Sequence, residues 1–236
     1  MILTAHQPVY MPWLGLFHKI SICDVFCFFD IVQYQRRDFN NRNKINTPNG
    51  PIWLTVPVFS KGRLESNIKE VIIKDDGWRE KHIRSLETSY GKSPFFDEYF
   101  SGLFHILRSD QERLVDLNYD LLKFFLKCLE IDTPIVRASS YNFEGTKSDL
   151  VLDMCLKLGA KTYVFGKQGK NYADLISFEK VGVKVYFQNY KHPNYLQKQT
   201  NFERDMSVVD LLFNHGKSSR NILLQNNIPK SEVSAL

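Results

Sequence analysis

The first 32 residues contain a strand, a helix and a second strand in close succession, and this unit constrains the fold more than any other feature. Residues 2–5 are apolar except for Thr4, and "DVFCFFDIV" at 24–32 is an apolar run with an acid near its end. Uninterrupted apolar runs of this length are typical of strands that are buried on both faces of a parallel sheet. Between the two runs, apolar residues recur at helical spacing: Trp13, Leu16, Phe17 and Ile20. A strand, helix and strand in this order predict two parallel strands joined by a crossover helix.

The rest of the chain extends this pattern around a helical segment. Further strands are predicted at 51–58, 68–74, 134–139, 161–166 and 182–188, and helices at 146–160 and 206–216. Residues 78–130 carry apolar side chains at helical spacing throughout, and we expect a helical insertion there. The sequence therefore predicts an α/β fold with a mostly parallel, Rossmann-like sheet. We expect one domain over 1–220 and a polar, frayed tail at 221–236.

Composition narrows the class of protein. Hydrophobic residues make up 43% and charged residues 24% of the chain, which is ordinary for a globular protein. The net charge of +5 mildly favours an anionic small molecule, nucleotide or membrane surface as partner, but there is no basic stripe that would favour nucleic acid.

No apolar run approaches the ~18 residues of a membrane span, and no secretory signal is evident, so we expect a cytoplasmic protein. The four cysteines lack metal-ligand spacing, so we expect reduced thiols and no metal site.

Polar residues follow the first two strands at the edge of the sheet where ligands of such folds bind. His6 and Gln7 come directly after the first strand, in the loop "HQPVYMPWLG", whose prolines restrict its backbone. We expect His6 to be a general base assisted by Gln7, with Tyr10 and Trp13 stacking on substrate. The alternative is that the polar pair only caps the loop. Asp30, a third candidate catalytic residue, and Gln33 end the second strand, where an acid can also cap a turn.

Four later segments add candidate substrate-binding residues. "QYQRRDFNNRNKI" at 33–45 interleaves cations with amides, a pattern that favours a diphosphate over a merely solvated loop: Arg36, Arg37, Asn41, Arg42, Asn43 and Lys44. "FGKQGKNY" at 165–172 offers a glycine-rich turn for an anion, with Lys167, Lys170 and Tyr172. After the last predicted strand come Gln188, Lys191 and His192, and Asn214 and His215 follow later, where they can equally form a helix C-cap.

Taken together, these segments resemble the WbqC-like family. The motifs "HQPVYMPWLGLFHKI", "DVFCFFDIVQYQRRDFNNRNKI", "WLTVPV", "FGKQGKNY", "FQNYKHPNY" and "SVVDLLFNHG" occur in one order over residues 1–220. The resemblance implies a role in bacterial O-antigen or other surface-polysaccharide biosynthesis. It also implies attachment of an amino acid such as glycine to an amino sugar.

A fainter resemblance concerns the mechanism. The order of strand, ligand loop, helix and strand is similar to that of nucleotidylyltransferase-like enzymes such as pantoate–β-alanine ligase, which activate a carboxylate with ATP. Their His-x-Gly-His motif would fall on residues 13–16, where only Gly15 matches. No cofactor is therefore fixed by the sequence, and ATP is the one that the resemblance suggests.

The function expected from the sequence is amide formation on a nucleotide-linked amino sugar. In this hypothesis the cations of residues 36–44 hold the diphosphate, and Lys167, Lys170 and Tyr172 hold the acyl donor. The alternative is a non-catalytic protein of the same pathway that binds sugar nucleotides or serves as a scaffold. A scaffold has no need for polar side chains converging at several strand ends, which favours the enzyme.

Overall fold

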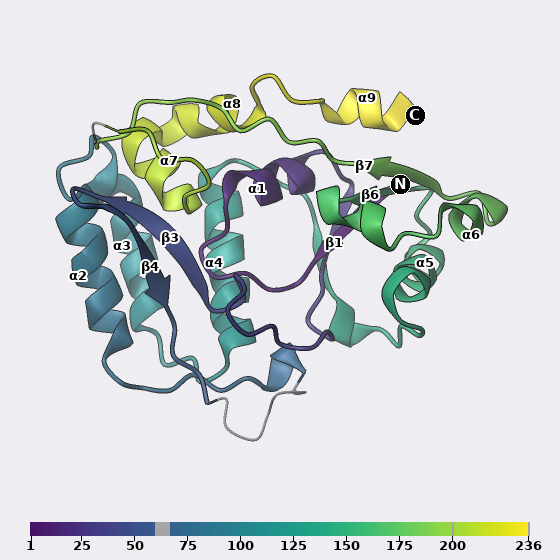
Figure 1. Cartoon of the computed structure of the whole chain (residues 1–236), viewed down its shortest axis with the longest axis horizontal. Coiled ribbons are helices and arrows are strands. Elements are labelled where there is room, and N and C mark those ends of the chain that lie inside the picture. The colour runs from purple at the N-terminus through teal and green to yellow at the C-terminus, as the bar shows by residue number, and fades with distance from the viewer. Residues whose placement is uncertain (60–66, 200, 236) are drawn as a thin grey trace.

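The centre of the molecule is a five-stranded sheet in which every pair of neighbours is parallel (Figure 1). The computed structural model describes residues 1–59, 67–199 and 201–235. The strands lie in the order β5-β2-β1-β6-β7: β5 (Ile135–Arg137), β2 (Val25–Phe28), β1 (Ile2–His6), β6 (Thr162–Phe165) and β7 (Lys184–Phe187). The chain moves outward from β1 through β2 to β5 and then returns to the other side of β1. This order confirms the predicted Rossmann-like α/β fold and places its switch point between β1 and β6.

Helices cover both faces of the sheet because successive side chains of each strand point to opposite faces. Leu3 and Ala5 of β1 and Cys27 of β2 form one apolar cluster with α5 (Lys147–Leu158) and α6 (Leu175–Lys180). Phe26 and Phe28 of β2 join the larger cluster on the other face, with α1 (Leu14–Ser21) and α7 (Val208–His215). Figure 1 shows α5 and α6 to the right of β1, away from α7.

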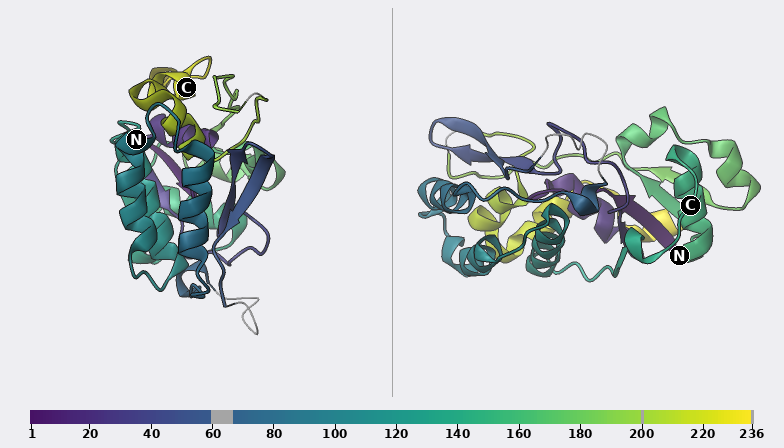
Figure 2. Two further views of the ribbon diagram at one scale, coloured as in Figure 1. Left: turned by 90° about the vertical axis from the view of Figure 1, so that its left-hand side faces the viewer. Right: turned by 90° about the horizontal axis from the view of Figure 1, so that it is seen from below.

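Residues 78–130 are helical, as predicted. They form α2 (Trp78–Tyr90), α3 (Phe96–Arg108) and α4 (Leu114–Cys128), which join α1 in the larger apolar cluster. The rings of Phe17 on α1 and Phe125 on α4 lie 6.2 Å apart, edge to face. Figure 2 shows these upright helices beside the hairpin of β3 and β4.

One predicted strand lies outside the parallel sheet, and another was wrong. The strand predicted at 51–58 is present as β4 (Gly50–Thr55), but it pairs in antiparallel register with β3 (Arg42–Thr47), a strand that the sequence did not predict. The connection is Pro48-Asn49, and Gly50 follows with φ +94°, a conformation that glycine adopts without strain. Residues 68–74 form a 3-10 turn (Ile68–Glu70) followed by single bridges to Val58 and Arg113.

The expectation of a frayed C-terminal tail was also wrong. The segment contains α8 (Ser219–Leu224) and α9 (Lys230–Ala235). Val233 of α9 is fully buried in a third cluster with Ile2, Ile22, Cys23 and Val164, and Lys230 pairs with Asp24 at 2.7 Å. These helices are too short for an apolar period, so only their tertiary contacts reveal them.

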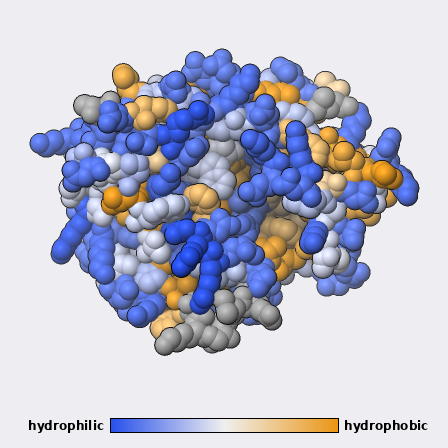
Figure 3. Space-filling view, in the orientation of Figure 1, coloured by the Kyte–Doolittle hydropathy of each residue, from blue (hydrophilic) through white to orange (hydrophobic). Residues whose placement is uncertain are grey.

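The surface facing the viewer is mostly hydrophilic (Figure 3). Hydrophobic residues gather over the right-hand end of this face, where Leu175, Ile176 and Val181 on and beside α6 are exposed. Within the described ranges, none of the helices combines the length and the apolarity that crossing a bilayer requires.

Candidate functional site

A cavity of about 410 Å³ opens at the carboxyl ends of β1, β6 and β7, on both sides of the switch point. Residues that follow the three strands form one side of it: His6, Gln7, Gly166, Lys167, Gln168, Gln188, Asn189 and Tyr190. The first turns of α1 and two loops form the rest: Trp13, Gly15, Leu16, Lys19, Asp38, Phe39 and Asp205. Ligands of open α/β sheets bind at this position, so the cavity is the candidate functional site.

His6 ends β1 at the wall of the cavity. Its Nδ1 lies 2.8 Å from the carbonyl oxygen of Gln7, and because a carbonyl only accepts hydrogen bonds, Nδ1 carries the proton in this contact. Burial and the charge of Lys19 lower the pKa of His6 to about 3. The imidazole is therefore neutral at physiological pH, and its Nε2 offers a lone pair.

A row of aromatic rings leads from His6 to the molecular surface. The ring of Trp13 lies 5.6 Å from that of His6 and 5.0 Å from that of Phe39. Phe39 in turn lies 5.7 Å from Trp53 of β4, which is 43% exposed. The guanidinium of Arg42 sits 4.3 Å from the centre of the Trp53 ring, and the Lys44 ammonium 5.9 Å from it. Aromatic rings beside cations suit the ring and phosphates of a nucleotide or sugar nucleotide.

Lys19 brings a buried cation to the same cavity. The side chain is 4% exposed, and its Nζ donates to the carbonyl oxygen of Ala5 at 3.0 Å. Burial lowers the pKa of Lys19 to about 8. Two carboxylates line the more open part: Asp38, which accepts a hydrogen bond from Gln7 Nε2 at 3.2 Å, and the exposed Asp205.

Gln188 fixes the end of β7 to α1. Its Nε2 donates to the carbonyl oxygen of Gly15 at 2.9 Å and to His18 Nδ1 at 2.8 Å. With Nδ1 accepting, His18 Nε2 donates to the carbonyl oxygen of Ile228 at 3.1 Å, and burial lowers the pKa of this histidine. Gln188 thus lines the cavity while its amide group also stabilises the wall.

Of the predicted acyl-donor residues, only Lys167 lines the cavity. Lys170 is exposed, with its ammonium 5.7 Å from the Phe187 ring, and Tyr172 packs edge to face on Phe165. The turn that carries them, Lys167–Asn171, is tight because Gly169 lies against Phe165, where a Cβ would approach the ring to 2.6 Å.

Asp30 lies outside the cavity. It is fully buried, and its carboxylate accepts hydrogen bonds from Arg137 Nε at 2.9 Å and from the backbone and hydroxyl of Ser139, both at 2.8 Å. All of these partners belong to the chain itself, so the contacts describe a structural ion pair at the β2–β5 edge.

Three predicted substrate contacts are used inside the fold. Tyr10 is fully buried, and its hydroxyl lies 2.8 Å from His82 Nδ1. Asn41 donates to the carbonyl oxygen of Val56, and Asn43 to that of Met11, each at 2.7 Å. Asn43 thus joins the hairpin to the first loop, and Asn41 joins the two open ends of the hairpin to each other.

The remaining predicted cations and polar residues do not line the cavity. Gln33, Arg36 and Arg37 are exposed; Arg37 has φ +59° and its carbonyl accepts a hydrogen bond from Arg42. The backbone of the exposed Lys191 bonds to Asn227, and His192 Nδ1 lies 2.8 Å from the Pro193 carbonyl oxygen. Asn214 donates to the carbonyl oxygen of Asp210 in its own helix, whereas His215 Nε2 lies 2.8 Å from the carbonyl oxygen of Leu196 outside α7, so His215 does not cap the helix.

The residues of the site region that sequence reasoning missed include the charged and aromatic side chains of Lys19, Asp38, Phe39, Trp53 and Asp205. Asp38 and Phe39 lie within "QYQRRDFNNRNKI", so that segment does reach the site, although through different residues. Lys19 gives no signal in the sequence because a lysine in an amphipathic helix normally faces solvent.

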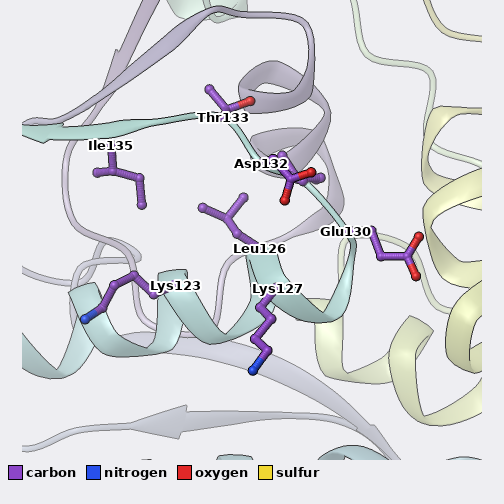
Figure 4. A pocket seen from close by; sticks show the side chains of 8 residues that line it. Lys123, Leu126, Lys127, Glu130, Asp132, Thr133 and Ile135 are labelled. Carbon is purple, nitrogen blue, oxygen red and sulfur yellow. The ribbon is translucent and has the colours of Figure 1, made fainter.

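A second hollow, of about 560 Å³, lies on a different part of the molecule (Figure 4). It is formed by the end of α4 and the segment leading into β5, and Figure 4 shows the Lys123 and Lys127 side chains pointing away from Leu126. The hollow is therefore beside the amino end of a strand, where folds of this type do not bind their ligands.

Comparison with known proteins places the chain in a family. The model of the WbqC-like protein family matches residues 7–222. The uncharacterized protein Rv1507c of Mycobacterium tuberculosis (strain ATCC 25618 / H37Rv) is 34% identical over 219 residues, which cover 92% of this chain and 95% of the relative. No solved structure matches the chain. The family match spans the cavity-lining residues from Gln7 to Asp205, and the chain belongs to the WbqC-like protein family.

Proposed function

We propose that the protein is an enzyme that forms an amide between a nucleotide-linked amino sugar and an amino acid, such as glycine, or another acyl group. Membership of the WbqC-like family suggests a role in polysaccharide biosynthesis. The observation that carries the proposal is the charge pattern of the cavity at the carboxyl ends of β1, β6 and β7, which we call the switch-point cavity. Lys19 and Lys167 suit a carboxylate or phosphate, and Asp38 and Asp205 suit an amine.

The proposed reaction brings a sugar amine to an acyl carbon, from which the activating group departs. His6 Nε2 is the candidate acceptor for a hydrogen bond from the amine. With a pKa of about 3, His6 by itself is a weak base. A bound anion beside it raises this pKa, so base catalysis by His6 is expected only in the substrate complex.

The aromatic row supports a position for the nucleotide sugar. A substrate that extends from His6 along Trp13 and Phe39 to Trp53 brings its diphosphate near Arg42 and Lys44. In this arrangement Arg42 and Lys44 keep the role expected from the sequence, whereas the exposed Arg36 and Arg37 do not contribute directly.

Mass spectrometry of the products tests the proposal. The protein is incubated with dTDP- and UDP-linked amino sugars and with glycine, supplied in separate reactions with ATP, as a thioester of coenzyme A, or on tRNA. We expect a glycyl amide of the amino sugar with one donor, and a turnover about 10²–10⁴-fold lower in His6→Ala. Binding of the sugar nucleotide without product from any donor would reject the enzyme and favour the alternative, a non-catalytic binding protein.

A further inference from the structure

Three carboxylate or ammonium side chains of the described residues are buried: Lys19, Asp30 and Asp210. Asp30 accepts three hydrogen bonds, one of them from Arg137. Asp210 also accepts three, from the hydroxyls of Tyr90 and Tyr195 at 2.9 Å and from Gln197 Nε2 at 2.8 Å. Both carboxylates are therefore satisfied within the protein.

Lys19 differs from both acids. An ammonium group has three N–H donors, and the contact with the Ala5 carbonyl oxygen occupies one of them. Within residues 1–59, 67–199 and 201–235, no aspartate or glutamate forms an ion pair with it. A buried charge without a counter-charge destabilises a fold by several kcal/mol, so the folded protein bears a cost here that its own contacts do not offset.

Among the described residues, the side chains next to Lys19 carry no negative charge that would neutralise its ammonium group. The neighbouring His6 is neutral. The Cys23 thiol donates to the Lys19 carbonyl oxygen, and burial raises its pKa to about 12, so it is neutral as well. The acids that line the cavity, Asp38 and Asp205, are more exposed than Lys19 and lie on loops. The inner end of the cavity is thus electropositive.

We propose that Lys19 binds an oxyanion, a phosphate or carboxylate oxygen of the substrate, at the inner end of the switch-point cavity. The proposal rests on the proposed function only in taking this cavity as the substrate site. The bound oxyanion supplies the negative charge that balances the Lys19 ammonium. It also accepts hydrogen bonds from the N–H groups of Lys19 that the Ala5 carbonyl oxygen does not use. Placed there, it also lies beside His6, where it raises the basicity of the imidazole.

Binding of simple anions to the whole protein tests the proposal without requiring turnover. The melting temperature is measured with increasing inorganic pyrophosphate, UDP, glycine and acetate, and each dissociation constant is obtained by titration calorimetry. We expect at least one anion to bind saturably to the parent. In Lys19→Met this affinity should fall roughly 10- to 100-fold, the effect of losing a hydrogen bond to a charged group. The matched control Lys123→Met, which removes a lysine from the hollow in Figure 4, should bind like the parent.

Two features of the result separate a ligand-binding role from a structural one. Without added anion, Lys19→Met should melt at or above the parent temperature, because it removes an uncompensated buried charge. Lys19→Gln keeps a donor for the Ala5 carbonyl oxygen and should lose anion binding equally, which covers the case in which the methionine variant does not fold. Binding of pyrophosphate and UDP alone would identify the oxyanion as a phosphate, and binding of glycine and acetate as a carboxylate.

The proposal is overturned if no anion stabilises the parent, or if Lys19→Gln binds anions with parent affinity. Failure of the proposed function gives a different pattern, in which Lys19-dependent anion binding persists although no amide forms with any donor.

Discussion

The carboxyl ends of β1 and β2 lie side by side in the sheet and look alike in the sequence, yet they differ in how their polar groups are satisfied. Each strand is mostly buried and has an ionisable residue at its carboxyl end: His6 is the last residue of β1, and Asp30 lies two residues after β2. At the end of β2, the carboxylate of Asp30 is enclosed by Arg137 and Ser139. At the end of β1, His6 has one backbone partner, and Lys19 behind it has one as well.

This difference shows what distinguishes a ligand site from a structural polar cluster at the same edge of a sheet. A buried charge whose hydrogen bonds are complete stabilises the native state, and a ligand gains little by approaching it. A buried charge with free donors is costly until something binds. Position at a strand end is shared by both regions. Of the two, as far as the described residues show, the region beside β1 is the one that has hydrogen-bonding capacity left over.

The largest expected effect concerns stability at the β2 end. Asp30→Asn removes the charge opposite Arg137 and places an amide among donors, so we expect the free energy of unfolding to fall by about 3 kcal/mol. Urea unfolding measures the loss. The control is Asp116→Asn, which removes the other, half-exposed partner of Arg137 and should cost less than ~1 kcal/mol. If Asp30→Asn were as stable as the parent but no longer bound substrate, Asp30 would be a ligand-binding residue, and the contrast between the two strand ends would be wrong.

A second effect is expected from His6, and it appears only when the pH is lowered. The pKa of His6 is about 3 in the folded protein and near 6.5 when unfolded, so the unfolded chain binds more protons between these values. The contribution of the neutral His6 is therefore complete above pH 6.5 and is lost as pH falls toward 3. His6→Asn, which keeps a donor for the Gln7 carbonyl oxygen, should match the parent at pH 8. Its stability should decline less steeply than that of the parent between pH 6.5 and 4, as measured by urea unfolding. Equal slopes would mean that His6 is not shielded from solvent.

A third effect concerns the far side of the cavity. Gln188→Ala leaves the Gly15 carbonyl oxygen and His18 Nδ1 without their donor, and we expect a loss of about 1–3 kcal/mol in stability. The matched control is Lys191→Ala, since Lys191 was predicted to bind substrate too but is exposed and bonds through its backbone. It should change stability by less than ~0.5 kcal/mol. A Gln188→Ala variant with parental stability and weaker ligand binding would instead assign Gln188 to substrate alone.

The parallel sheet and the position of the cavity follow from the sequence because their signals are local. Apolar runs identify β1, β2, β6 and β7, and the edge at which polar loops emerge follows from parallel topology. The β3–β4 hairpin was missed although Pro48-Asn49-Gly50 is a turn signal, because the segment 33–45, which includes the first half of β3, is interpreted from the sequence as an anion-binding segment. β3 is polar because the side chains of two of its residues bond to other parts of the chain: Asn43 to the Met11 carbonyl oxygen and Asn46 to the side chain of Gln197.

The roles of individual side chains could not be predicted because they depend on what the fold brings next to them. Lys19 is buried since α1 lies over the end of β1, and Tyr10 is buried since α2 supplies His82 from 72 positions further along the chain. Asp30 finds Arg137 and Ser139 more than a hundred residues later. None of these pairings has a sequence period or spacing from which it could be read.

The smallest expected effect lies at the mouth of the cavity, between Gln7 and Asp38. Their hydrogen bond is 3.2 Å long and partly exposed, so Gln7→Ala should lower the free energy of unfolding by only about 0.5–1 kcal/mol. If Gln7 serves to orient Asp38 toward a substrate amine, Gln7→Ala and Asp38→Asn should weaken binding of an amino sugar nucleotide by less together than the sum of their separate effects. Binding of the matching sugar nucleotide without the amino group serves as the control, and neither substitution should change it. Additive effects, or equal losses for both ligands, would mean that the Gln7–Asp38 pair only closes the loop, as the β2 end does with Asp30. The difference between the two strand ends would then rest on Lys19 and His6 alone.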